Sequence, residues 1–288
     1  MKPILSTTLD SSSLNRLIND LKSHSIPFNH PYMTHAFKVE DTLIQIYSSK
    51  KVVFTGALAQ ELKDRYEAKF TFTPHAGSDE VGTGDYFGPV VVCACALHLE
   101  HLPLLENYTI MDSKVLDDHD MIRIYQDLKE HIPHSLMIVS PTKYNQIHQT
   151  HNMNAIKAKL HYEAYVTLAK KTSLPSLCVI DQFTPETSFY RYLNLKPQKD
   201  LPLHFETKAE SKYLAVALAS VFARAVFVLT LQQIQDHYQI LLPKGAGSGV
   251  DQAARHFIEV HGETALKHVA KLHFINTSRV LNKEETCQ

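Results

Sequence analysis

The sequence predicts an α/β protein made of two domains, and three observations support this prediction. Apolar segments with strand periodicity alternate with helical patterns along the chain, which favours a mixed sheet flanked by helices. A length of 288 residues allows one large domain or two smaller ones. The stretch FTFTPHAGS, residues 70–78, indicates a linker between an N-terminal module (1–70) and a larger domain (75–288).

The N-terminal module combines two helical patterns with strand patterns between them. Serines precede leucines and an isoleucine at helical spacing within 11–25, which predicts a capped amphipathic helix. Residues 37–49 and 50–59 predict two strands joined near 48–50, and 57–69 predicts the second helix. The module has nine basic and seven acidic residues, so it carries a net charge of +2.

The larger domain begins with a predicted hairpin and continues with β–α units. Strands are expected at 75–80 and 89–99 around a glycine turn at 82–88, and then at 107–112, 135–140 and 174–181. Helices are expected at 117–131, through most of 143–172, at 211–236 and after the loop PKGAGSGVD. The run 214–231 is almost wholly apolar. Arg224 near its centre would cost roughly 2.5–3.5 kcal/mol in a bilayer, so we expect a buried helix there.

Composition indicates a globular protein and gives little information about partners. The chain is 44% hydrophobic and 20% charged with a net charge of −1, so bulk charge does not indicate nucleic-acid binding. The four cysteines are expected to be reduced, and the 18 histidines lack metal-ligand spacing. No N-terminal segment has the apolar core of a signal peptide. We therefore expect a soluble cytoplasmic protein without a membrane or an obligatory protein partner.

Acidic residues occur at the ends of three predicted strands. Asp79 ends the first strand, with Glu80 directly beside it, and Asp112 and Asp181 end two later ones. Neighbouring strands would bring such ends to one edge of the sheet, where ligand sites of α/β proteins commonly lie. Adjacent carboxylates on a strand project to opposite sides, so Asp79 and Glu80 would reach different parts of one cluster. An acid at the end of a strand, taken alone, is more typical of a turn or a helix cap than of a metal ligand.

A cluster of this kind favours a particular chemistry. Three or four carboxylates within a few ångströms cannot all be ionised unless cations neutralise them. Oxygen ligands suit Mg²⁺ or Mn²⁺, and pairs of these ions activate water in phosphodiester hydrolysis. The glycine turn GTGDYFG could instead hold a nucleotide phosphate. However, it leads into a strand and lacks the Gly-Lys-Ser/Thr sequence of a phosphate-binding loop.

Five motifs taken in order resemble one enzyme family. GSDEVGTGDYFGPVVVCA, MDSK, VIDQF, TKAESKYLAVALASVFAR and LPKGAGSGVD look like bacterial ribonuclease HIII, a type 2 ribonuclease H, over about residues 75–270. Ribonuclease HII resembles the same region but usually has a GRG loop in place of GTG. The N-terminal segment LIQIYSSKKVVFTGA is similar to half of a TATA-box-binding protein, a domain that precedes the catalytic domain in ribonuclease HIII.

The resemblance implies a fold, an activity and a metal site. The implied fold is an RNase H-like five-stranded mixed sheet with flanking helices, after a small α/β TATA-binding-protein-like domain. The implied activity is metal-dependent endonucleolytic cleavage of the RNA strand of RNA/DNA hybrids, leaving 3′-hydroxyl and 5′-phosphate ends. The acids that match the family's Mg²⁺ or Mn²⁺ ligands, and hence its catalytic residues, are Asp79, Glu80, Asp181 and Glu210. Asp112 would then order the site or hold Lys114.

Substrate contacts are expected from the glycine turn and from lysines. Backbone groups of Gly82, Thr83 and Gly84 would contact ribose 2′-hydroxyls, and a side chain at either glycine would clash with substrate more than with the protein. Phosphate contacts are expected from Lys114 and, in the N-terminal module, from Lys50 and Lys51. Weaker candidates, for which a solvated surface or core packing is an equal alternative, are Arg65, Tyr86, Phe87, Lys212 and Lys244.

Two other functions stay open at this point. One is ribonuclease HII-like cleavage at single ribonucleotides embedded in DNA, against which the GTG loop and the N-terminal module argue. The other is hybrid binding without catalysis, against which the presence of all four acids argues.

Overall fold

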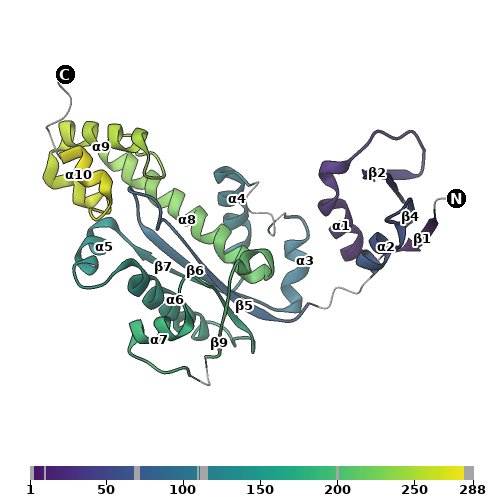
Figure 1. The fold of residues 1–288 in the computed structure, drawn as a ribbon, viewed down its shortest axis with the longest axis horizontal. Helices are drawn as coiled ribbons and strands as arrows, with labels where there is room; N and C mark the ends of the chain where they lie inside the picture. Colours follow the sequence, from purple (N-terminus) through teal and green to yellow (C-terminus); the bar gives the residue numbers. More distant parts are fainter. Residues whose placement is uncertain are drawn as a thin grey trace. The chain divides into compact units, whose positions relative to one another are not determined.

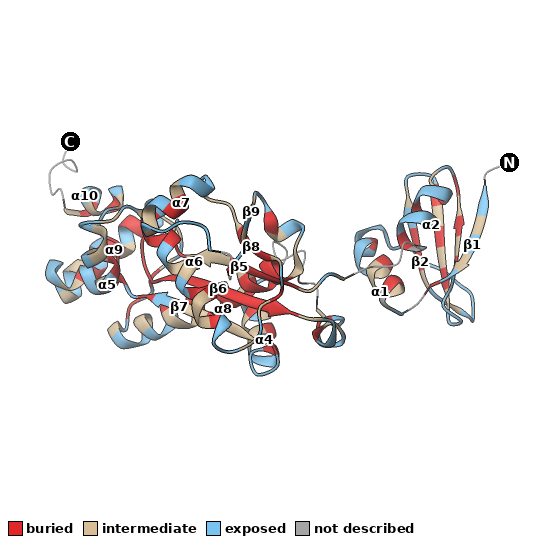
Figure 2. Ribbon diagram, turned by 90° about the horizontal axis from the view of Figure 1, so that it is seen from below, coloured by how far each residue is buried: buried red, intermediate tan, exposed pale blue. Residues whose placement is uncertain are grey.

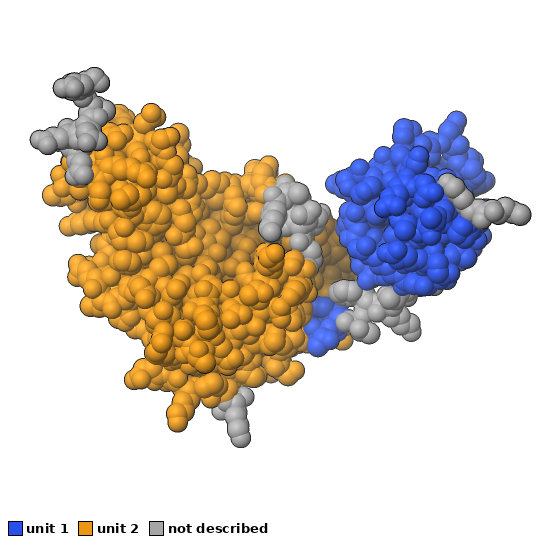
Figure 3. All heavy atoms as spheres, viewed as in Figure 1, with its two compact units in different colours: residues 1–73 blue, residues 74–288 orange. Residues whose placement is uncertain are grey.

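The structure is a computed structural model that describes residues 3–9, 11–67, 72–108, 110, 116–198 and 201–281. The chain divides into two compact units, residues 1–73 and 74–288 (Figure 3). Each unit has a hydrophobic core of its own. The described cysteines, Cys93, Cys95 and Cys178, are buried free thiols, as expected.

The N-terminal unit is a four-stranded antiparallel sheet with two helices. The strand order is β1-β4-β3-β2, with β1 at Ile4–Thr8, β2 at Met33–Val39, β3 at Thr42–Tyr47 and β4 at Lys51–Thr55. The helices are α1 (Ser11–Asp20) and α2 (Ala59–Glu67). Alternate residues of β3 and β4, among them Ile44, Ile46, Val52 and Phe54, are buried with Leu17 and Leu62 of the helices. The helices therefore cover one face of the sheet.

Two strands of this unit differ from the prediction. Residues 37–49 were expected to form one strand, but Glu40 has a positive φ of 51° and the segment turns there into the β2–β3 hairpin. Strand β1 was not expected. Its sequence, ILSTT, is short and half polar, and it gains its hydrogen-bonding partner, β4, from more than 40 residues away.

The larger unit contains a five-stranded mixed sheet, which confirms the predicted fold class. Its order is β7-β6-β5-β8-β9, and Figure 2 labels all five strands. The central strand β5 (His75–Val81) pairs antiparallel with β6 (Val90–Leu97), which pairs antiparallel with β7 (His134–Val139). On its other side β5 pairs parallel with β8 (Cys178–Asp181), and β8 pairs parallel with β9 (Leu203–Glu206). The expected long apolar strand 89–99 is β6, and all its residues are buried.

Two strand predictions in this unit need correction. Strand β9 lies in a stretch that was interpreted as irregular, and only pairing with the distant β8 makes it a strand. A strand was expected over 107–112, but Asn107, Tyr108 and Ile110 are not in a strand. The other residues of that segment, including Asp112, lie outside the described residues.

Helices cover both faces of this sheet (Figure 1). Helix α8 (Leu214–Tyr238) packs on β5 and β6 with α4 (Asp118–Leu128) beside it, whereas α6 (Met153–Ala169) packs on β6 and β7 beside α7 (Glu186–Leu193). The remaining α-helices of the described part of this unit are α3 (Leu102–Leu105), α5 (Pro141–His148), α9 (Ser248–His261) and α10 (Ile275–Leu281).

Helix α8 is the one described helix that is long and apolar enough to cross a membrane. Within its most apolar stretch, however, 67% of the residues are buried inside the protein. Figure 2 shows the buried residues concentrated along α8 and the central strands beneath it. The expectation of a buried helix over 211–236 therefore agrees with the structure.

Candidate active site

The two adjacent acidic side chains of strand β5 point to opposite faces of the sheet. Asp79 faces α8, where its carboxyl group hydrogen-bonds the side chain of Ser220. Glu80 faces α6, where its carboxylate contacts Lys157 and His161. The two-residue period of a strand produces this separation, as the sequence predicted.

A glycine allows α8 to lie close to this strand. Gly77 precedes Asp79 by two residues and so faces α8 as well. A Cβ atom at Gly77 would lie 2.3 Å from the backbone nitrogen of Val216. Any side chain at this position would push α8 away from the strand, and with it the hydroxyl group of Ser220.

The other two predicted acids lie beside β5. Asp181 is the last residue of β8, the parallel neighbour of β5, so its carboxyl group reaches the same edge of the sheet. One of its oxygens, Oδ1, accepts a hydrogen bond from the Ala209 backbone N–H at 2.9 Å. Glu210 follows in a short 3₁₀ turn (Ala209–Ser211), and its carboxyl group hydrogen-bonds that of Asp181. The structure thus brings all four predicted acids together.

The acids influence one another's protonation. Burial and the charge of Glu80 raise the pKa of Asp79 to about 7, although hydrogen bonds from Ser220 and the Glu80 backbone oppose the rise. Burial and the neighbouring Glu210 also raise the pKa of Asp181. These raised pKa values mean that burial and mutual repulsion destabilise the ionised carboxylates, and a divalent cation bound between them would stabilise the ionised form. The oxygen-only donor set therefore fits Mg²⁺ or Mn²⁺.

Glu80 behaves in the opposite way. Burial alone would raise its pKa, but the hydrogen bond with His161 and the ion pair with Lys157 outweigh burial, so its pKa lies below the ordinary value. The His161 Nε2–Glu80 Oε2 distance is 2.8 Å. Neither partner stands out in the sequence, which leaves His161 among the surface or core histidines. The signal that could have found them is their spacing of four residues on a helix face that is otherwise apolar.

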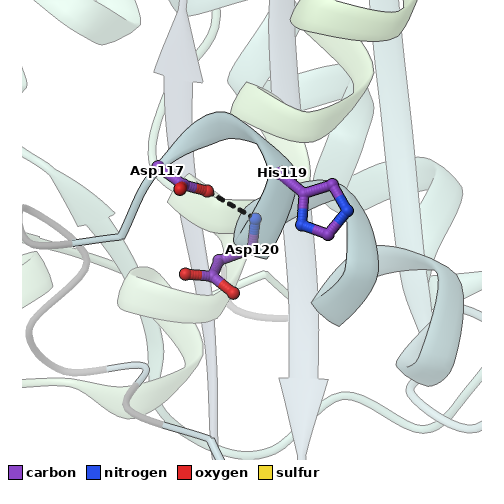
Figure 4. A group of neighbouring side chains, drawn as sticks. All are labelled: Asp117, His119 and Asp120. Carbon is purple, nitrogen blue, oxygen red and sulfur yellow. Dashed lines mark hydrogen bonds between the residues drawn. The ribbon is translucent and has the colours of Figure 1, made fainter.

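A different group of three potential ligands lies elsewhere in the described structure. Potential ligand atoms of Asp117, His119 and Asp120 lie within 4.8 Å of one another at the start of α4. Figure 4 shows the Asp117 carboxylate accepting a hydrogen bond from the Asp120 backbone N–H, at 2.8 Å. Asp120 also pairs with Arg123 at 3.0 Å. These contacts are those of a helix cap on the surface, and none of the four predicted acids belongs to the group.

The two glycines of the GTG turn have different roles in the structure. Gly82 is buried with a φ of +92°, and a Cβ atom there would lie 2.2 Å from the Pro89 carbonyl oxygen. Gly84 is exposed, and a Cβ atom there would meet nothing within 4 Å. The expectation that a side chain at either glycine would clash with substrate more than with the protein is therefore wrong for Gly82, whereas at Gly84 the protein leaves room for a side chain. Thr83, between them, is partly exposed.

The C-terminal segment holds this loop in place. The Tyr86 backbone N–H donates to the Gly245 carbonyl at 2.8 Å, and the Gly245 N–H donates to the Asp85 carboxylate at 2.6 Å. The fully buried Lys271 donates to the carbonyl oxygens of Phe87 and Gly88 at 3.3 and 2.7 Å. The predicted loop PKGAGSGVD thus supports the predicted substrate loop.

Several weaker candidates can now be assigned. Tyr86 and Phe87 are fully buried, so the idea that they stack on substrate is wrong, and they are core residues. Lys212 forms an ion pair with Glu206, and Lys244 forms one with Asp118. Lys114 and Asp112 lie outside the described residues, so their roles stay predictions.

The two lysines of the N-terminal unit predicted to contact phosphate, Lys50 and Lys51, lie at the β3–β4 turn and the start of β4. Lys50 has a φ of +62° and donates to the Ser11 hydroxyl at 2.7 Å, which ties the turn to α1. Lys51 is exposed and lines a hollow of about 400 Å³. The other lining residues are Tyr32, Tyr47, Ser48, Ser49 and Val53. Arg65 lies on α2, within 3.7 Å of Asp20.

Comparison with known proteins identifies the family. The family model described as "Ribonuclease HII" matches residues 76–277, and one described as "Domain of unknown function (DUF3378)" matches residues 6–76. A ribonuclease HIII from Streptococcus agalactiae is 35% identical over 283 residues, which cover 94% of this chain and 95% of the relative. The chain belongs to the ribonuclease HIII family.

Other members of the ribonuclease HIII family agree with this assignment. A ribonuclease HIII from Streptococcus thermophilus is 35% identical over 287 residues, covering 96% of this chain and 97% of the relative. The solved structure of Bst-RNase HIII in complex with Mn²⁺ is 31% identical, with a TM-score of 0.70 and coverage of 97% and 98%. The predicted family and the predicted enzyme class, ribonuclease H, are confirmed.

Proposed function

We propose that this chain is a divalent-metal-dependent endoribonuclease that cleaves the RNA strand of RNA/DNA hybrids and leaves 3′-hydroxyl and 5′-phosphate ends. Membership of the ribonuclease HIII family supports the enzyme class. The observation that carries the proposal is the gathering of four acids, Asp79, Glu80, Asp181 and Glu210, at one edge of the sheet.

These four acids are the proposed ligands of Mg²⁺ or Mn²⁺. When bound between such carboxylates, divalent cations activate water and stabilise the oxygen that leaves phosphorus. Two backbone amides orient the carboxyl groups, since Asp79 accepts from the Glu80 N–H at 2.8 Å and Asp181 accepts from the Ala209 N–H. Fixed carboxylates need little rearrangement when a cation binds. The Mn²⁺ in the related Bst-RNase HIII supports this choice of ion.

Recognition of RNA is assigned to the backbone of the GTG turn. Gly84 is exposed, and the space beside its α-carbon is open, so a ribose could approach its amide and carbonyl groups. Gly82 supports the turn by adopting a positive φ that most residues avoid. Backbone contact with a 2′-hydroxyl distinguishes RNA from DNA without reading the base sequence.

The N-terminal unit is proposed to bind the hybrid through the open face of its sheet. Helices cover one face only, and the hollow lined by Lys51, Tyr32 and Tyr47 lies on the other side of the unit's strands. A cation beside aromatic rings suits a phosphate next to a sugar or base. Lys51 would supply a phosphate contact on this face and Lys50 a second one at the neighbouring turn after release from Ser11, so that affinity for hybrid falls as salt rises.

A variant of Lys51 tests this role. Lys51→Gln should raise the KM for a long hybrid several-fold with little change in kcat, because binding of this kind is equal in the ground and transition states. Lys63→Gln on α2, which removes the same charge from the helical side, is the matched control. An unchanged KM for Lys51→Gln would show that the hollow is not part of the substrate-binding surface.

A panel of labelled substrates tests the proposed activity. The protein should cut an RNA/DNA hybrid in Mg²⁺ or Mn²⁺, should leave double-stranded RNA intact, and should lose activity in a chelator. Efficient cutting of a DNA duplex that contains one ribonucleotide would indicate ribonuclease HII-like action instead. Binding of hybrid without any cleavage in either metal would show a non-catalytic protein.

The location of the protein in the cell is also a proposal. We propose the cytoplasm, where RNA/DNA hybrids of a bacterial cell would be accessible. Burial of the apolar helix α8 within the fold supports this choice. Recovery of the protein with the membrane fraction after cell lysis would contradict it.

A further inference from the structure

Glu80 differs from the other site acids because basic side chains already hold both of its oxygens. Oε1 forms an ion pair with the Lys157 ammonium group, and Oε2 accepts from His161 Nε2 at 2.8 Å. The three side chains are 12%, 10% and 0% exposed, so little water screens these contacts. A buried ammonium group is costly unless a charged partner compensates it, so the pairing with Glu80 is energetically important to both residues.

The protein fixes these two basic residues on several sides. They lie one turn apart on α6, whose first turn is capped by the Asn152 side chain through the Ala155 N–H. Phe183 covers both, with its ring centre 3.9 Å from Lys157 Nζ and its ring stacked on His161. The remaining His161 nitrogen, Nδ1, hydrogen-bonds the Ser78 hydroxyl at 2.8 Å. Helix α6 therefore offers a preformed partner for one carboxylate of the cluster.

The two partners differ in what they would do to a cation at Glu80. An ammonium group supplies a positive charge at the oxygen that a divalent cation would also use, so the two compete. An imidazole N–H that donates to the other oxygen orients the carboxylate and leaves the first oxygen available. The outcomes of removing Lys157 and of removing His161 should thus have opposite signs.

We propose that Lys157 is a positioning residue that competes with the divalent cation for Glu80, whereas His161 positions Glu80 for the cation. The inference rests on the proposed metal site but concerns residues outside the four acids. Lys157 neutralises part of the cluster before a cation binds and sets an upper limit on the affinity for the cation. A nuclease that must release its products benefits from ions that are not held too tightly.

The test is calorimetric titration of Mn²⁺ into the full chain, freed of metal by a chelator and without nucleic acid. Lys157→Met and Lys157→Gln should each tighten the Kd for Mn²⁺ by about tenfold. His161→Asn should weaken it by roughly tenfold or more. Lys157→Arg, which keeps the charge, should bind as the wild type does.

Lys159→Met is the matched control, because Lys159 lies two residues along α6, is exposed and contacts His151 instead of the acids. Its Kd should not change. Thermal unfolding gives a second readout: Lys157→Gln should unfold at a lower temperature than the wild type in chelator, and the difference should close in saturating Mn²⁺.

An unchanged or weaker Mn²⁺ affinity in Lys157→Gln would overturn the inference, even if Lys157→Met fails to fold. Lys157 would then be a structural brace only. This failure is distinct from failure of the proposed function. If the wild type cleaves hybrid and binds Mn²⁺, and the Lys157 variants bind Mn²⁺ with the same affinity as the wild type, only the inference about Lys157 is wrong. If the wild type neither binds Mn²⁺ nor cleaves hybrid, the inference and the proposed function are both wrong.

Discussion

Asp79 and Glu80 are neighbours in the sequence, but they have opposite electrostatic environments. Asp79 faces α8, where it meets a hydroxyl group and other acids, and its pKa rises to about 7 through burial and the charge of Glu80. Glu80 faces α6. Burial would raise its pKa too, but His161 and Lys157 lower it below the ordinary value. The difference shows that the two helices determine the charge state of a pair that the sequence makes almost equivalent.

A similar contrast separates the two glycines that follow. Gly82 is needed by the protein, because its backbone conformation and the nearby Pro89 carbonyl exclude a side chain. Gly84 has open space beside its α-carbon, so packing within the protein does not require a glycine there. In both pairs, residues that are close in the sequence have different surroundings in the fold.

The largest expected effect is the loss of cleavage, which should be similar for substitution of either acid. Asp79→Asn and Glu80→Gln should each lower kcat on RNA/DNA hybrid by about 10³-fold or more, since each removes a charge from a shared cation site. Single-turnover cleavage at saturating Mg²⁺ measures this. Asp236→Asn, on the exposed end of α8, is the control. A near-normal rate in either acid variant would remove that residue from the site.

Both variants should lose cleavage, but without metal they should change the free energy of unfolding in opposite directions. Glu80→Gln should lower the free energy of unfolding by about 2–4 kcal/mol, because Lys157 loses its charged partner. Asp79→Asn should raise it by about 1–2 kcal/mol at pH 8, because it removes a charge that burial and neighbouring acids disfavour. Urea unfolding in chelator gives both values. Changes of the same sign would contradict the described difference between the two faces.

The glycines offer a parallel comparison. Gly82→Val should lower the free energy of unfolding by about 2 kcal/mol or more, since a β-branched residue would take a positive φ against the Pro89 carbonyl. Gly84→Val should change it by less than about 0.5 kcal/mol and still reduce hybrid cleavage. Thermal unfolding and cleavage assays on both variants separate the effects. A stable, active Gly84→Val protein would show that the turn does not contact substrate.

Lys271 provides a pH-dependent effect on stability. Lys271 donates to backbone carbonyls, and burial lowers its pKa to about 7, although the charge of Asp85 opposes the change. Between about pH 7 and 10 the unfolded chain holds a proton that the folded chain has released. The stability of the wild type relative to Lys271→Met should therefore increase with pH, by up to about 1.4 kcal/mol per unit. A difference that is flat over this range would show that Lys271 stays charged when buried.

The sequence predicted the features of this site that depend on local pattern. The two-residue period of β5 predicted that Asp79 and Glu80 lie on opposite faces. The apolar run that ends at Asp181 predicted the strand β8, which is the neighbour of β5. Contacts between distant segments were missed. Glu80 and His161 are 81 residues apart, and the spacing of four between His161 and Lys157 was the one local sign of their role. Strand β9 was missed for the same reason, because its sequence is ordinary until β8 pairs with it.

We infer that the adjacent acids of β5 serve one cation site from opposite faces of a strand. A crystal of the full chain soaked in Mn²⁺ tests it most directly, through the anomalous signal of manganese. We expect a manganese peak in contact with carboxylate oxygens of both Asp79 and Glu80. A peak confined to the surface group of Asp117, His119 and Asp120, with none at β5, would contradict it.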